Sequence, residues 1–104
     1  MPTRREKLQD MLQSSPDDPF LHYGLAMEDR TAGDLNAAAD GLRKVLELDG
    51  DYVAAHFHLG QVLAEQGDAT SARQILQDGI AVAARIGDGH AQGEMTEFLQ
   101  SLPE

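Results

Sequence analysis

A glycine–aspartate pair recurs along this chain at a spacing that constrains the fold more than any other feature. Gly33-Asp34 is followed by Gly67-Asp68, and alanines recur at the same interval as Ala38 and Ala72. Glycine is suited to end one helix and aspartate to begin the next. A helix–turn–helix unit repeated with a period of about 34 residues predicts a stack of helix pairs, because one pair cannot bury its own apolar face.

Further turn residues divide the chain into helical segments. Thr3 and Glu6 have the spacing of a capping box, and Asp18-Pro19 has the residue types that begin a helix. β-Branched residues are few, and the alternation of apolar and polar residues that is typical of strands is missing. The sequence therefore predicts an all-α fold with helices near residues 4–14, 19–30, 35–48, 52–66, 69–86 and 90–102.

The repeated residues resemble the tetratricopeptide repeat family. The second repeat matches the family's motif with His56, Leu59-Gly60, Leu63, Gly67-Asp68, Ala72, Leu76 and Gly79. The first matches it with Phe20, Tyr23-Gly24, Met27, Gly33-Asp34, Ala38, Leu42 and Val45. The chain departs from the motif at Gly50, where proline is usual, and at His56, where tryptophan is usual. Because apolar bulk is kept at most positions, we expect the fold to tolerate these departures.

The resemblance implies an α–α superhelix in a single domain that spans residues 1–104. We expect one repeat over about 17–52, a second over about 53–86, a capping helix before them and another over about 88–102. Gly24 and Gly60 are interpreted as equivalent positions at which paired helices approach closely. Since these glycines are 36 residues apart, the first pair is expected to hold about two extra residues before its turn.

The charge balance limits the kinds of partner. The chain has 8 Lys and Arg against 18 Asp and Glu, a formal net charge of −10. Binding to nucleic acid or to an anionic membrane surface needs clustered cations, so neither is expected. A partner protein or peptide that is apolar with basic flanks fits better. The chain has no cysteine, no apolar stretch long enough to span a membrane and no signal-peptide core, from which we predict a cytoplasmic protein.

The histidines and acidic residues form no pattern that is typical of a catalytic or metal site. On a helix, His56 and His58 point in different directions and cannot hold one ion together. The glycines fall singly rather than in a phosphate-binding loop, and most aspartates stand at helix starts, where they cap. We therefore predict no catalysis, no cofactor and no metal. A metal-dependent enzyme that uses His56, His58 or His90 is a remote alternative.

The family resemblance also implies where a partner binds. In this family the first helix of each pair lines a concave groove that takes a peptide or a helix. The positions carried over to this chain are Leu21, Leu25, Glu28, Asp29, Ala54, Phe57, Gln61, Ala64, Glu65, Ala91, Met95, Phe98 and Leu99. Leu21, Leu25 and Phe57 are apolar on a face that is otherwise solvated, which favours binding. The alternative is that the capping helices cover them.

Two other possibilities concern the partner itself. One subclass of the family grips a C-terminal carboxylate with cations in the groove. The matching positions here are Leu21, Leu25, His58, Asp88 and Gln92, and they do not supply the required cation. Binding of chaperone tails is therefore not expected. The open ends of a short solenoid also allow a self-associating scaffold, possible as a homodimer, as the main alternative to an adaptor.

Overall fold

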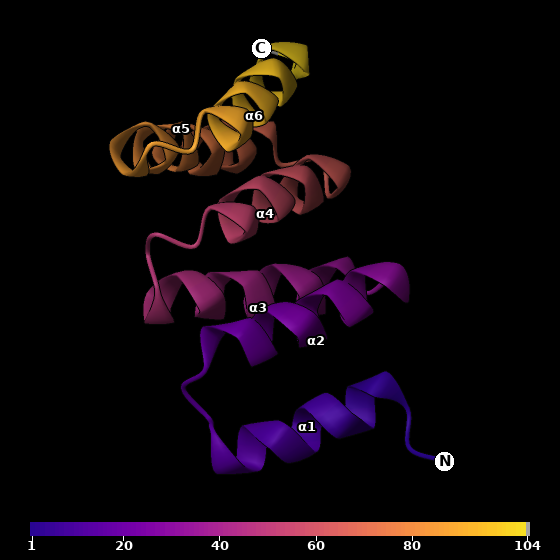
Figure 1. The fold of residues 1–104 in the computed structure, drawn as a ribbon. Helices are drawn as coiled ribbons and strands as arrows, with labels where there is room; N and C mark the ends of the chain where they lie inside the picture. Colours follow the sequence, from indigo (N-terminus) through magenta and orange to yellow (C-terminus); the bar gives the residue numbers. More distant parts are fainter. Residues whose placement is uncertain (104) are drawn as a thin grey trace.

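The computed structural model describes residues 1–103, which form helices and no strand. Figure 1 shows the helices stacked along the molecule, with the N-terminus at one end and the C-terminus at the other. The stack measures 44 × 29 × 20 Å. The predicted all-α helical repeat is confirmed, and its helices are α1 (Arg4–Ser14), α2 (Pro19–Thr31), α3 (Leu35–Leu48), α4 (Val53–Glu65), α5 (Ala69–Ile86) and α6 (Gly89–Ser101).

Aspartates and glycines set the boundaries of these helices. Asp34 and Asp68 accept hydrogen bonds from backbone N–H groups in the first turns of α3 and α5, each over 3.1 Å. The capping box predicted at the start of α1 is confirmed, since Thr3 Oγ1 accepts from Glu6 N and the Glu6 carboxylate accepts from Thr3 N. Gly33 and Gly67 have φ values of +85° and +84°, a conformation that side chains disfavour. The repeated Gly-Asp pair therefore ends one helix and begins the next.

Each helix packs on its neighbour in the chain, and α4 also contacts α6. The core between the layers holds aliphatic side chains that are fully buried, including Leu42, Leu59 and Leu76. Ala38 and Ala72, the alanines of the repeat, are both 0 % exposed. Among residues 1–103, no helix is both long and apolar enough to cross a membrane.

The register of the first repeat differs from the prediction. Helices α2 and α4 both have 13 residues and begin at Pro19 and Val53, so the interval of 34 residues holds throughout. Ala26, not Gly24, therefore takes the place of Gly60. The prediction that Gly24 and Gly60 are equivalent, with two extra residues in the first pair, is wrong.

The close approaches between helices explain this register. A Cβ atom on Gly60 would lie 2.6 Å from Leu76 Cδ2, so α4 and α5 do approach at Gly60. In the first pair the small residue is on the other helix, since a Cβ on Gly41 would lie 2.9 Å from Ala26 Cβ. Gly24 instead faces α1, where a Cβ would lie 3.2 Å from Leu8 Cδ1. The glycine at the close approach thus lies on the second helix, α3, in the first pair, and on the first helix, α4, in the second pair.

Candidate protein-binding surface

Helices α2 and α4 are joined by one polar side chain. Arg30 Nη1 lies 3.0 Å from His58 Nδ1 and donates to Gln61 Oε1 over 2.9 Å. Its Nη2 donates to Glu65 Oε1 over 2.7 Å. These contacts, together with the packing of α4 against α6, place the first helices of successive pairs side by side. We call the surface shared by α2, α4 and α6 the first-helix face.

Residues predicted on α4 lie together on this face. Phe57 and Gln61 are half-buried, and Glu65 is exposed. The ring centroid of Phe57 lies 5.9 Å from that of His58 and 6.2 Å from that of Phe98 on α6. The helix thus presents an aromatic residue flanked by polar ones, and their role in binding stays a prediction.

The positions predicted on α2 point elsewhere. Leu21 is only 3 % exposed, so it is a core residue and not an open apolar site. Glu28 and Asp29 form ion pairs with Arg4 and Arg5 of α1, over 2.9 Å and 2.7 Å. The predicted placement of Leu21, Glu28 and Asp29 is therefore wrong, because these residues face the core or α1. The placement of Leu25, which is half-buried, stays a prediction.

Tyr23 and Arg30 replace them on the first-helix face. Tyr23 lies 34 residues before Phe57, and its ring centroid is 5.8 Å from that of His58. A constant interval of 34 residues, applied to the whole of α2, would have found both residues. The prediction instead aligned Gly24 with Gly60, which shifted the register of α2 by two residues.

Helix α6 is also turned differently from the prediction. Met95 is 0 % exposed and packs at Gly79 of α5, so its predicted place in the groove is wrong. Phe98 is half-buried and its ring faces Phe57 at 72° between the ring planes. The acidic residues Glu94 and Glu97 lie on the exposed side of the helix, and they were not among the residues predicted to line the groove.

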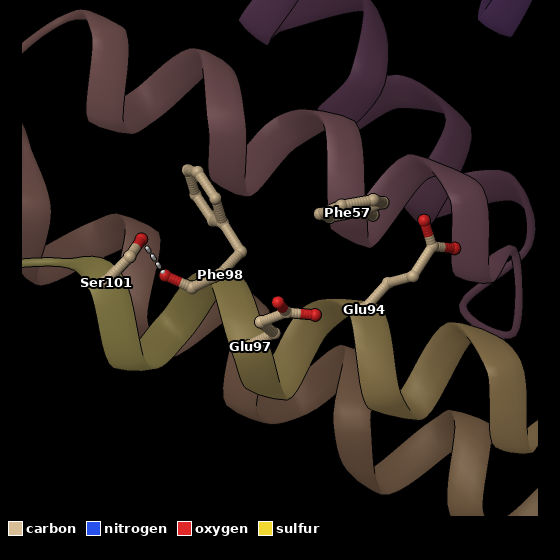
Figure 2. Close-up of a pocket in the computed structure, with 5 residues that line it drawn as sticks. All are labelled: Phe57, Glu94, Glu97, Phe98 and Ser101. Atoms are coloured by element: carbon tan, nitrogen blue, oxygen red, sulfur yellow. Dashed lines mark hydrogen bonds between the residues drawn. The ribbon is translucent and has the colours of Figure 1, made fainter.

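A recess lies between α4 and α6, with a volume of about 290 Å³, and is lined by Phe57, Glu94, Glu97, Phe98 and Ser101. In Figure 2, the side chains of Glu94 and Glu97 rise from α6 beside the rings of Phe57 and Phe98. A second hollow shares Phe57 and Glu94 with the recess, and a third shares Phe98 and extends to Arg30. We call these three adjoining hollows together the α4–α6 groove.

The imidazole of His58 stands at the wall of this groove. Burial, and then the Arg30 guanidinium, lower the pKa of His58, while Gln61 and Glu94 oppose the shift. Because Arg30 carries only donors, His58 Nδ1 accepts and the ring proton sits on Nε2. His58 is therefore a neutral acceptor that holds Arg30 in place.

Ion pairs neutralise the carboxylates unevenly along the first-helix face. Glu65 pairs with Arg30 on this face, whereas Glu28 and Asp29 pair with Arg4 and Arg5 on the side of α2 that faces α1. Glu94 pairs with His90, whose side chain is 87 % exposed, and a histidine is not an obligatory cation. Within residues 1–103, Glu97 has no cation within 4.0 Å. On the first-helix face, Glu94 and Glu97 of α6 are thus the carboxylates that lack an arginine partner, whereas Glu65 of α4 has one.

The histidines at the starts of α2 and α4 have structural contacts. His22 Nε2 lies 2.7 Å from Pro16 O, and His56 Nε2 lies 3.0 Å from Gly50 O. Both histidines thus bond the carbonyl six residues earlier. Over the part of the chain that the structure describes, no three histidine or acidic side chains are grouped to hold a metal ion.

Comparison with known proteins decides the family. A family model described as tetratricopeptide repeat matches residues 30–92, more than half of the chain. The chain is a tetratricopeptide repeat protein. A repeat-containing protein of Pseudomonas aeruginosa is 39 % identical to it over 97 residues, which cover 93 % of this chain and 92 % of that protein. Tetratricopeptide repeats generally mediate protein–protein interaction, through the surfaces that stacked repeats create.

Two further similarities concern a solved structure and a longer protein. The solution structure of a Bordetella parapertussis protein superposes with a TM-score of 0.83 at 33 % identity, covering 96 % of this tetratricopeptide repeat chain and 87 % of that one. A Pseudomonas putida protein named as a probable biofilm formation methyltransferase is 36 % identical over 81 residues. The match covers 78 % of this chain but only 19 % of that protein.

Proposed function

We propose that this tetratricopeptide repeat protein binds a segment of a partner protein along the α4–α6 groove and has no catalysis of its own. The observation that carries the proposal is that Phe57 and Phe98 line adjoining hollows between α4 and α6. A surface hollow with aromatic residues at its centre and polar groups at its rim is typical of protein recognition sites.

The partner segment combines apolar side chains with a net positive charge. The aromatic residues of the groove favour apolar side chains in the partner. The overall charge of −10 favours a positively charged partner through long-range attraction. Because Arg30 is already bonded to three acceptors, it offers little to an anionic partner. An adaptor role for a basic, partly apolar segment follows.

The methyltransferase name of the P. putida protein does not lead us to propose an enzyme. The matched segment is about a fifth of that protein, and the name describes the whole of it. In this chain His58, one of the titratable side chains that line the groove, is engaged with Arg30. The aspartates at the helix starts bond backbone N–H groups. Because His58 and these aspartates are engaged in hydrogen bonds that maintain the fold, we do not propose them as catalytic acids or bases.

Selection from random peptides displayed on phage tests the proposal without knowledge of the partner. A selected peptide is titrated into ¹⁵N-labelled protein, and we expect the amide shifts to concentrate on α4 and α6. Phe98→Gln should weaken binding, whereas Ile86→Gln on α5, where the side chain is also exposed to solvent, should not. Melting curves confirm that both variants fold. An empty selection, or shifts concentrated on α3 and α5, contradicts the proposal.

A further inference from the structure

The polar atoms of the recess between α4 and α6 are all hydrogen-bond acceptors. Glu94 and Glu97 contribute carboxylates, which only accept when ionised. The Ser101 hydroxyl donates its hydrogen to Phe98 O over 2.6 Å, so its oxygen faces the recess with lone pairs alone. A group that enters this recess must therefore supply the donors.

The aromatic residues of the recess add a second preference. The rings of Phe57 and Phe98 are 6.2 Å apart and tilted at 72°, so the face of one ring and the edge of the other border the same opening. Aromatic faces attract cations, and guanidinium groups most often, while the aliphatic stem of a basic side chain packs on the ring. The acceptors and the rings therefore both favour a cationic side chain that carries hydrogen-bond donors.

Charge compensation singles out this recess along the first-helix face. The carboxylate of this face that lies toward α2, Glu65, already has Arg30 as its partner. At Glu94 the partner is the exposed His90, which a stronger cation can displace. A purely apolar anchor would instead desolvate two carboxylates without compensation, which is unfavourable.

From these three observations we propose that the recess of Phe57, Phe98, Glu94 and Glu97 binds a basic side chain of the partner. The stem packs on the rings, and the cationic head donates to the two carboxylates. Arginine fits better than lysine, because its planar group stacks on rings and carries five donors in a fixed fork. This inference rests on the proposed function and assigns the position of the partner's positive charge.

Peptides that wild-type protein selects from the random phage library provide the probe. We expect arginine or lysine to be enriched at one fixed position. A selected peptide is synthesised with arginine, lysine or citrulline there, since citrulline keeps the shape and loses the charge. The affinity should fall about tenfold from arginine to citrulline, the sum expected of an exposed ion pair and a cation–aromatic contact, with lysine between them.

Variants of the protein complete the test. Glu94→Gln with Glu97→Gln should weaken the arginine peptide by about two- to fivefold, because the ion pair is lost and the cation–aromatic contact is kept. The citrulline peptide should be nearly unchanged, because it makes no ion pair for these variants to remove. The matched control is Asp40→Asn with Glu47→Gln, which changes the net charge equally on α3, where both side chains are exposed. That control should leave both peptides nearly unchanged.

The outcomes separate this inference from the proposed function. Peptides that bind the α4–α6 groove without a preferred basic residue overturn the inference and leave the proposed function standing. Equal weakening of the arginine and citrulline peptides by the glutamine variants, or equal weakening by the α3 control, also overturns the inference. A library that yields no peptide, or peptides that bind α3 and α5, overturns both.

Discussion

At the scale of the residue, Arg30 has the largest number of contacts between repeats. One guanidinium joins α2 to His58, Gln61 and Glu65 of α4, and its side chain is only 22 % exposed. Protonation of His58 would remove the acceptor at Nδ1 and place a second cation beside Arg30. The lowered pKa of His58 follows from its burial and this neighbour.

The stability of the fold should therefore depend on pH through His58. The pKa of His58 in the folded chain is below the unfolded value of about 6.5. At a pH between these two pKa values, His58 is protonated in the unfolded chain and neutral in the folded chain. The stabilisation is complete above pH 6.5 and is lost as the pH falls below it. Between about pH 7.5 and 5.5, the melting temperature should fall more for wild type than for His58→Gln. Parallel melting profiles would show that His58 does not contribute.

Two glycines on first helices should respond oppositely to alanine. Gly60→Ala should destabilise the protein by about 1–3 kcal/mol, because the new Cβ would overlap Leu76. A Cβ on Gly93 of α6 would meet nothing within 4 Å, so Gly93→Ala should stabilise by about 0.5–1 kcal/mol through helix propensity. Urea unfolding monitored by circular dichroism measures both. A gain in stability at Gly60 would contradict the close approach of α4 and α5.

At the scale of the element, α2, α3, α5 and α6 each begin with an aspartate whose side chain accepts from a backbone N–H of the first turn. Asp34→Ala removes the bond from Asp34 Oδ1 to Ala37 N and should lower the free energy of unfolding by about 1 kcal/mol. Asp40→Ala, on the exposed side of α3, serves as the control and should have little effect. Equal effects in chemical denaturation would argue that capping does not set the start of α3.

The helix boundaries could be predicted from the sequence, whereas the face that a helix turns to the core could not. Helix starts and ends were predictable, because capping residues act locally and need no knowledge of the tertiary fold. The face that α2 turns to solvent was not predictable from its glycine, since the small residue of that helix crossing lies at Gly41 on α3. Likewise, Met95 and Phe98 are both apolar residues of α6, and only the space at Gly79 determines that Met95 is the buried one.

At the scale of the whole molecule, the stack is held unequally along its length. Helix α1 buries one side chain, Leu8, and is otherwise attached by the ion pairs of Arg4 and Arg5. Helices α3, α4 and α5 each bury four residues or more. Since exposed ion pairs contribute little and repeats stabilise their neighbours, the first helix should open before the middle of the stack.

Hydrogen–deuterium exchange measures this order directly. We expect the amides of α1 to exchange first and those of α4 to exchange last, with salt speeding the exchange of α1 by screening its ion pairs. Uniform exchange along the chain would instead indicate that the stack opens as one cooperative unit.

The arginine-free surroundings of Glu94 and Glu97 have a consequence for engineering. These side chains are exposed and hold no helix to another, so the residues that specify the ligand are separable from those that maintain the architecture. Replacing both with lysine should redirect the groove toward acidic peptides while leaving the melting temperature nearly unaltered. Substitutions on α6 alone should therefore change which peptides the groove binds.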